Sequence, residues 1–263
     1  MKNLPSYINK LFSLEGKVAV IIGGGGHICS SLAEGFSLAG ASLSIVDLRL
    51  EKALKISQNI HSKYGTKVIS LQADAGKEDS LKNALSHTLK EFSKIDILIN
   101  GAGKNSPKPF LEIAIEEWDD VIRSQITATM LGCKIFGSQM LEQKRGSIIN
   151  ISSASSGPPL SKAFAYSVAK AGIKNLTMNL AREWGTENVR VNAIRPGFFP
   201  TEWNKKNFIN PQREKAIINH TPMKRFGEPH ELIGAAIWLA SDSSKFVTGA
   251  EITVDGGFSC MTI

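Results

Sequence analysis

The sequence has few cysteines and no long apolar segment. Its three cysteines, Cys29, Cys133 and Cys260, are odd in number, widely spaced and without the spacing of metal ligands. This pattern predicts no metal site and no disulfide framework, and it suits a reducing cytoplasm. No run of eighteen apolar residues occurs, and the first residues lack the apolar core of a signal peptide. We therefore expect neither membrane spanning nor export.

Dense clusters of positive charge, low-complexity segments and internal repeats are also missing. Lysine and arginine (31) outnumber aspartate and glutamate (24), which gives a net charge of +7, but the basic residues are spread along the chain. We expect a solvated basic surface that favours anionic small molecules, and no binding to nucleic acid. The hydrophobic fraction of 42% is typical of a globular protein, and 263 residues fit one α/β domain over 1–263.

Three groups suited to acid–base chemistry lie close together in the sequence. Apolar positions across 164–184 recur at helical spacing, so Tyr166 and Lys170 fall one turn apart on the same helix face. An adjacent ammonium favours phenolate, so we expect the pKa of Tyr166 to be lowered toward neutrality. Ser153 follows a strand-like run, 146–151, and its hydroxyl could face the same point. A Tyr and a Lys four apart also occur by chance, so the pair needs its context.

A glycine-rich turn lies near the start of the chain. An apolar run, 17–22, is followed by four glycines, 23–26, and then by a helical pattern. Such a turn lets backbone N–H groups and a helix N-terminus approach a pyrophosphate. The next expected strand, 43–46, leads to Asp47, whose carboxylate suits the ribose hydroxyls of an adenosine and repels a 2′-phosphate. NAD(H) is therefore favoured, while Arg49 keeps NADP(H) open because it could pair with that phosphate.

Together these residues resemble the short-chain dehydrogenase/reductase family, whose active site has a Tyr four residues before a Lys and a Ser thirteen residues before the Tyr. Ser153, Tyr166 and Lys170 match that pattern, and the resemblance extends from Leu14 to Phe258. It implies a single doubly wound Rossmann-type α/β domain with a seven-stranded parallel sheet in the order 3-2-1-4-5-6-7 and helices on both faces. Alternating strands and helices favour the same class. A homotetramer is also implied.

The resemblance assigns cofactor contacts to positions that match the family motifs. They are Gly23, Gly26, His27, Ile28, Asp47, Asp74, Ala75, Asn100, Ala102, Gly103, Tyr166, Lys170, Pro196, Gly197 and Thr201. The chain departs from the family where His27 and Cys29 replace glycines and Gly101 replaces an asparagine. Side chains at positions 27 and 29 could crowd the pyrophosphate or the packing of helix on strand.

A further departure is Gln125, in an expected helix over 116–140, where the family commonly has an asparagine. In the family that asparagine helps to hold a water that extends a proton relay from the lysine, so Gln125 joins the implied catalytic group. The resemblance implies that Tyr166 exchanges a proton with the substrate oxygen while Ser153 holds that oxygen. Lys170 is expected to lower the pKa of Tyr166 and to bind the nicotinamide ribose.

Within the family, segments 196–199 and 220–227 look most like the sugar-acid subgroup of mannonate and fructuronate oxidoreductases. Loop residues expected near an anionic substrate, each with a solvated surface role as its alternative, are Lys104, Asn105, Lys108, Lys162 and Lys205. We expect a loosely organised arm over 1–13 and a mobile substrate loop over 202–226. A 3-oxoacyl-(acyl carrier protein) reductase is the alternative enzyme. A catalytically weak binding or assembly protein is the alternative of another class.

Overall fold

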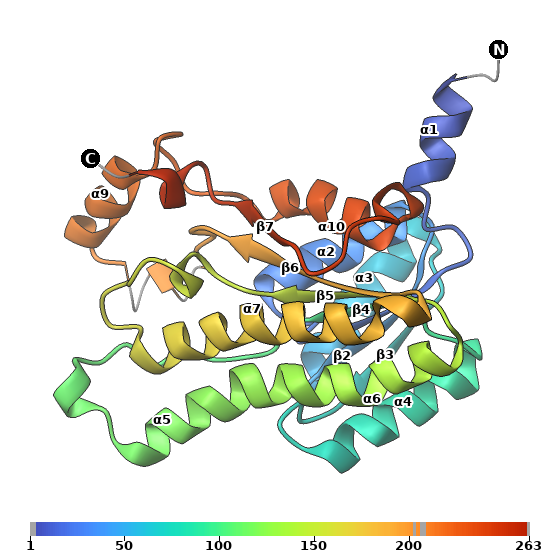
Figure 1. Cartoon of the computed structure of the whole chain (residues 1–263), viewed down its shortest axis with the longest axis horizontal. Coiled ribbons are helices and arrows are strands. Elements are labelled where there is room, and N and C mark those ends of the chain that lie inside the picture. Colours follow the sequence, from blue (N-terminus) through green and yellow to red (C-terminus); the bar gives the residue numbers. More distant parts are fainter. Residues whose placement is uncertain (1–3, 202–203, 206–208, 262–263) are drawn as a thin grey trace.

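A parallel sheet forms the centre of the computed structural model, which describes residues 4–201, 204–205 and 209–261. Its strands are ordered β3-β2-β1-β4-β5-β6-β7, and each pairs in parallel with its neighbours (Figure 1). The strands are β1 (Val18–Ile22), β2 (Ser42–Asp47), β3 (Val68–Gln72), β4 (Ile97–Asn100), β5 (Gly146–Ile151), β6 (Val189–Pro196) and β7 (Glu251–Val254). The predicted fold class and strand order are confirmed.

Helices cover both faces of this sheet, as Figure 1 shows. One face is packed by α2 (His27–Leu38), α3 (Leu50–Tyr64) and α10 (Ile233–Ala240), and the other by α4 (Glu78–Phe92), α6 (Ala128–Glu142) and α7 (Phe164–Trp184). The remaining α-helices are α1 (Leu4–Phe12), α5 (Ile115–Ile122) and α9 (Pro211–His220). Single helical turns are η1 (Phe110–Glu112), the π-helical η2 (Arg123–Thr127), η3 (Ala154–Ser156), η4 (Gly185–Glu187), η5 (Pro229–Leu232), η6 (Asp242–Ser244) and η7 (Phe258–Cys260).

Two hydrophobic clusters hold the layers together, one on each face. Phe36 of α2 is fully buried in the first, and Phe136 of α6 is fully buried in the second. The central strands β1 and β4 are buried along their whole length because helices cover them on both sides. This burial explains why they appear in the sequence as continuous apolar runs. Within the described ranges, no helix is long and apolar enough to cross a membrane.

Three segments differ from the sequence-based expectations. The arm expected to be loosely organised forms helix α1 from Leu4 to Phe12. The expected substrate loop over 202–226 contains helix α9, while its residues 202–203 and 206–208 lie outside the described part. The helix expected over 116–140 does run without a break from α5 to α6, but its residues Arg123–Thr127 form an unexpected π-helical turn.

Candidate active site

The predicted site residues gather at the carboxyl edge of the sheet, where ligands bind in open α/β folds. Gly23, Asp47, Ala102, Ser153 and Gly197 each end a strand or follow within two residues of its last residue. The other predicted positions lie in the same turns or in the first two turns of the helices that follow, except Gln125, in the π-helical turn before α6. Parallel pairing of consecutive strands places these turns side by side.

The glycine-rich turn passes close to the turn that follows β4. Gly23 has a φ of +78°, and a Cβ there would lie 2.7 Å from the backbone nitrogen of Ala102. Helix α2 begins at His27 after Gly26, and no side chain caps it or places a negative charge in its first turn. Its first N–H groups and positive dipole end are therefore available to a pyrophosphate. This turn fits a dinucleotide.

Asp47 fixes the other side of that turn. Its Oδ2 accepts a hydrogen bond from Gly25 N at 3.0 Å, and its Oδ1 accepts one from Arg49 N at 3.0 Å. The residue is 9% exposed. The carboxylate thus stands at the end of β2 beside the glycine turn, where the ribose of a bound adenosine would place its hydroxyls.

The replacements at positions 27, 29 and 101 do not crowd this turn. His27 is exposed. Cys29 points into the core, where burial raises the pKa of its thiol to about 12. A Cβ built on Gly101 would overlap the Cys29 sulfur. The thiol therefore occupies the space left by the missing asparagine side chain, and the two departures compensate each other.

Asn100 supports the floor of the site. Its Nδ2 donates to Asn150 Oδ1 at 2.9 Å, and Asn150 Nδ2 donates in turn to Thr177 Oγ1 at 2.9 Å. All three side chains are buried, so the network ties β4, β5 and α7 together. Asp74, two residues after the end of β3, accepts a hydrogen bond from Gly76 N at 2.9 Å, and Ala75 is buried beside it.

The turn after β6 approaches the end of β7. Gly197 N donates to Val254 O at 3.0 Å, and a Cβ at Gly197 would lie 2.7 Å from Asp255 Cα. Only glycine fits there without displacing backbone. Thr201 follows, and its hydroxyl accepts a hydrogen bond from Asn204 N at 2.9 Å.

Ser153, Tyr166 and Lys170 come together as predicted. Ser153 caps η3, and its Oγ accepts hydrogen bonds from Ser155 N at 3.2 Å and from Ser155 Oγ at 3.1 Å. A hydrogen bond also joins Ser153 to the phenol of Tyr166. Lys170 Nζ lies 5.4 Å from the centre of the Tyr166 ring and donates to Ile151 O at 2.6 Å.

The expected lowering of the pKa of Tyr166 is wrong for this structure. Burial raises the pKa of Tyr166, because a phenolate loses hydration there, and the hydrogen bond from Ser153 only partly opposes this. Burial lowers the pKa of Lys170 to about 8, which the neighbouring Cys29 partly opposes. Burial therefore disfavours the charged form of both groups, the phenolate of Tyr166 and the ammonium of Lys170.

Gln125 lies in the π-helical turn and is 3% exposed. Its Nε2 donates to Lys104 O at 2.9 Å, while its Oε1 is buried without a hydrogen-bond partner in the described part of the chain. Ser124 Oγ accepts a hydrogen bond from Lys104 N at 3.3 Å. The turn thus holds the start of the 104–109 loop. Its role in a proton relay stays a prediction.

Loop lysines expected near the substrate are partly engaged elsewhere. Lys104 Nζ pairs with Asp120 at 2.8 Å, and Lys108 Nζ pairs with Glu117 at 2.7 Å, both on α5. Asn105 is partly buried next to them. Lys162 is exposed just before α7, and Lys205 follows Thr201 in the short described segment 204–205.

A cation that the sequence did not single out contacts the loop over 152–163 between β5 and α7, here called the catalytic loop. Arg213 of α9 donates from Nη1 to Ser161 Oγ at 2.8 Å and from Nη2 to Ser161 O at 3.3 Å. Ser161 precedes Tyr166 by five residues. The contact joins two segments 52 residues apart, so no local pattern could have indicated it.

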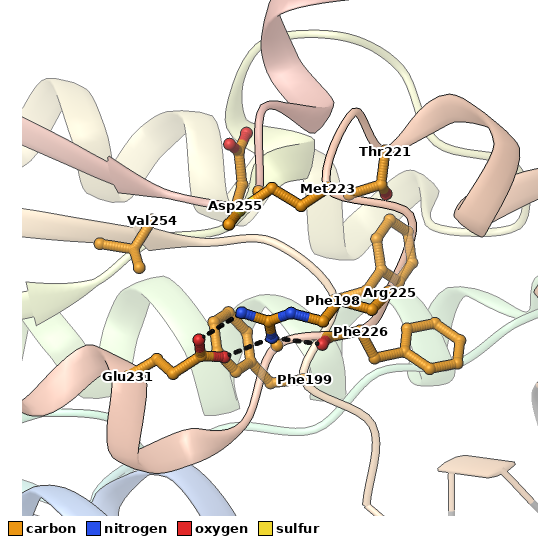
Figure 2. Close-up of a pocket in the computed structure, with 11 residues that line it drawn as sticks. Phe198, Phe199, Thr221, Met223, Arg225, Phe226, Glu231, Val254 and Asp255 are labelled. Carbon is orange, nitrogen blue, oxygen red and sulfur yellow. Dashed lines mark hydrogen bonds and ion pairs between the residues drawn. The ribbon is translucent and has the colours of Figure 1, made fainter.

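A separate pocket lies behind the turn after β6 (Figure 2). Phe198, Phe199 and Phe226 line it, and Arg225 donates to Glu231 at 2.8 and 2.6 Å across its mouth. Its lining includes none of the predicted catalytic or cofactor-binding residues, although Thr221, Met223, Arg225 and Phe226 belong to the expected substrate loop. The pocket is therefore separate from the candidate active site.

Comparison with known proteins agrees with this geometry. Residues 26–259 match the family described as enoyl-(acyl carrier protein) reductase. The chain is 35% identical to the 5-keto-D-gluconate 5-reductase of Escherichia coli, over 95% of this chain and 98% of that one. The chain belongs to the short-chain dehydrogenase/reductase family. It is an oxidoreductase that uses a nicotinamide cofactor.

Two solved structures share both fold and sequence with the chain. A gluconate 5-dehydrogenase from Burkholderia cenocepacia, in complex with NADP and tartrate, has 29% identity and a TM-score of 0.92, covering 97% of this chain and 100% of its own. A protein from Haemophilus influenza with bound NAD, assigned provisionally as a D-mannonate oxidoreductase, has 33% identity and a TM-score of 0.91, covering 97% and 99%.

Proposed function

We propose that this enzyme interconverts a carbonyl and a secondary alcohol on a sugar acid or a related polyol. The observation that carries the proposal is the convergence of Ser153, Tyr166 and Lys170 beside a glycine turn that fits a dinucleotide. Bound nicotinamide supplies the hydride in reduction and accepts it in oxidation. The protein's own groups handle the proton and hold the substrate oxygen.

The protonation states of the site suit this division of roles. Tyr166 is neutral in the free enzyme, so it can donate a proton to the oxygen of a carbonyl substrate as that oxygen gains negative charge. Ser153 already bonds to this phenol and can hold the same oxygen. Lys170, whose pKa burial lowers to about 8, still carries its proton at neutral pH and can return a proton to the Tyr166 phenolate.

The substrate class is supported by the relatives and by the charge of the site region. Two of the proteins compared act, by their names, on gluconate or its 5-keto form. Arg213 reaches from α9 to the catalytic loop, and its guanidinium adds positive charge to this part of the molecule. The net charge of +7 would favour the approach of an anion.

We also propose that NAD(H) is preferred to NADP(H). The Asp47 carboxylate beside the glycine turn would repel a 2′-phosphate. The relatives compared include both a complex with NADP and one with NAD, so the preference rests on Asp47 itself.

Assembly as a homotetramer in the cytoplasm is the last part of the proposal. An apolar surface, here called the α5–α7 patch, consists of Phe110, Leu111, Ile115, Phe164 and Val168, which are 58%, 96%, 65%, 42% and 54% exposed. A contiguous apolar surface of this kind is typical of an interface between subunits. All three cysteines are free, which suits a reducing compartment.

A substrate panel tests the function directly. The purified protein would be assayed by nicotinamide absorbance against sugar acids, neutral polyols and 3-oxoacyl thioesters, each with both cofactors. We expect the highest kcat/KM with a sugar acid and NAD(H), and a fall in kcat/KM as salt shortens the Debye length from about 30 Å at 0.01 M to about 8 Å at 0.15 M. A preference for a 3-oxoacyl thioester would establish the alternative enzyme instead.

A further inference from the structure

A buried carboxylate lies beneath the segment that carries Ser153. Glu251, the first residue of β7, has a side chain that is 10% exposed. Its Oε1 accepts hydrogen bonds from Ser152 Oγ at 2.6 Å and from Ser156 Oγ at 2.9 Å. Hydroxyl bonds to a carboxylate are among the stronger hydrogen bonds in proteins. The last strand of the sheet is thus tied to both ends of the 152–156 segment of the catalytic loop.

Two cations complete this cluster. Arg195 Nη1 lies 3.5 Å and Lys174 Nζ lies 3.6 Å from Glu251 Oε2. The side chain of Arg195, 11% exposed, also donates from Nη2 to Ala154 O at 3.1 Å. A buried carboxylate is costly unless it is paired and hydrogen-bonded, and here both of its oxygens are engaged. The fold therefore compensates the cost of burying the Glu251 carboxylate.

Every second residue of the 152–156 segment contacts Glu251 or Arg195, and Ser153 is not one of them. The residues anchored to Glu251 or Arg195 are Ser152, Ala154 and Ser156, which alternate with Ser153 and Ser155. The Ser153 hydroxyl is held instead by Ser155 and bonds to Tyr166. The backbone at Ser153 is extended, so its side chain and that of the anchored Ser152 point to opposite sides of the chain. The helical turn η3 that follows is held at Ala154 O and Ser156 Oγ, so the segment is fixed on both sides of Ser153.

We propose that Glu251 is a positioning residue for Ser153. Through Ser152, Ser156 and Arg195 it holds the 152–156 segment so that the Ser153 hydroxyl faces the phenol of Tyr166 in the reacting geometry. Glu251 touches neither substrate nor cofactor. The proposal requires that the chain catalyses an oxidoreductase reaction, and it does not depend on which substrate the panel identifies.

Glu251→Gln is the first test, because it keeps the size of the side chain and one carbonyl acceptor but removes the charge that pairs with Arg195. We expect kcat to fall roughly 10- to 100-fold, as misplacement of a reacting group by about 1 Å does. The Kd for NADH, measured by fluorescence titration, should change less than about threefold, because the cofactor contacts are untouched. Kinetics use any panel substrate that the parent converts.

Asp96→Asn is the matched control. Asp96 is also 10% exposed, accepts a backbone hydrogen bond from Val18 at 2.9 Å, and pairs with Lys94 at 3.1 Å and Arg145 at 3.3 Å. It precedes β4, at the opposite edge of the sheet from the site. We expect a similar loss of Tm in both variants but an unchanged kcat in Asp96→Asn. An equal fall of kcat in both would reduce Glu251 to a general stabilising role and overturn the proposal.

A second variant covers the case in which Glu251→Gln does not fold. Ser152→Ala combined with Ser156→Ala removes the two hydroxyl anchors and keeps the ion pairs of Glu251. Hydrogen exchange followed by mass spectrometry, which needs no substrate, should show faster exchange in the 152–157 segment, including the Ser155 amide that bonds to Ser153 Oγ. Exchange and kcat equal to those of the parent would overturn the proposal. Faster exchange with a lower kcat would support it.

Discussion

Tyr166 is the residue on which the chemistry depends. Burial keeps its phenol protonated, and its hydrogen bond with Ser153 orients it. Tyr166→Phe should therefore preserve the fold and cofactor binding but lower turnover by about 10²–10⁴, the usual contribution of a positioned acid or base. Steady-state kinetics and circular dichroism of the purified variant measure both effects. Turnover close to that of the parent would remove Tyr166 from the catalytic group.

Lys170 gives the fold a testable dependence on pH. Its folded-state pKa of about 8 lies below its ordinary value of 10.5, so below pH 8 both folded and unfolded chains carry the charge and the cost of burying it is constant. Between pH 8 and 10.5 the folded chain loses the proton first, so stability rises with pH, by up to about 3 kcal/mol from this group. The Lys170→Met variant has no ionisable group at this position, so its stability lacks this dependence on pH.

We therefore expect the free energy of unfolding of Lys170→Met, minus that of the parent, to fall as pH rises from 7 to 10. Urea titrations at each pH provide these values. The loss of the hydrogen bond to Ile151 O is independent of pH and shifts every point equally. A difference that stays constant across this range would contradict the lowered pKa of Lys170.

Asp47 governs the choice of cofactor through one charge. Asp47→Ala should narrow the difference in affinity between NADH and NADPH, because repulsion of the 2′-phosphate is removed. Asp47→Asn is the companion variant, since its amide oxygen can still accept the hydrogen bond from Gly25. Fluorescence titration of both cofactors measures the change. Tighter binding of NADPH than NADH by the parent would refute the preference itself.

At the scale of elements, the central strands and most of the covering helices could be predicted, with α7 found over 164–184, whereas α9 and the π-helical turn could not. Strands buried on both faces leave continuous apolar runs, so β1 and β5 were found within one residue of their ends. Helix α9 was missed although Asn210 caps it and Pro211 occupies its first turn, because its polar residues conceal any apolar periodicity. The π-helical turn around Gln125 has no sequence signal.

The contact between helix α2 and the end of β4 offers a test of compensating substitutions. Gly101→Asn restores the residue expected from the family but places a side chain where the Cys29 sulfur lies. It should destabilise the fold by about 1–3 kcal/mol through overpacking. Cys29→Gly combined with Gly101→Asn should recover much of this loss, with a coupling of about 0.5–3 kcal/mol.

Urea unfolding of the four proteins of this double-mutant cycle gives the coupling energy. Cys260→Ala with Gly101→Asn is a suitable control, because Cys260 is exposed and lies in η7, away from this contact. Additive effects of Cys29→Gly and Gly101→Asn would contradict the compensation.

At the scale of the whole molecule, the site combines what spacing can predict with what only the fold brings together. Ser153, Tyr166 and Lys170 lie within eighteen residues, so their motif identified them. Glu251 and Arg213 reach the same loop from 95 and 52 residues away, and no local pattern marks them. The role of the loop lysines toward a substrate stays a prediction, and in this structure Lys104 and Lys108 are paired with carboxylates on α5.

The α5–α7 patch predicts how the whole molecule assembles. The rings of Phe110 and Phe164 pack in a tilted arrangement with their centres 5.2 Å apart, so residues of η1 and α7 form one apolar surface. Leu111→Glu combined with Val168→Glu should desolvate charge in any interface that covers this surface and so shift the protein to smaller species. Light scattering after size-exclusion chromatography measures the mass. Phe246→Glu, a fully exposed residue between η6 and β7, is the control and should leave the mass unchanged. If the parent is monomeric, or if the double variant keeps the mass of a tetrameric parent, the patch is not the interface.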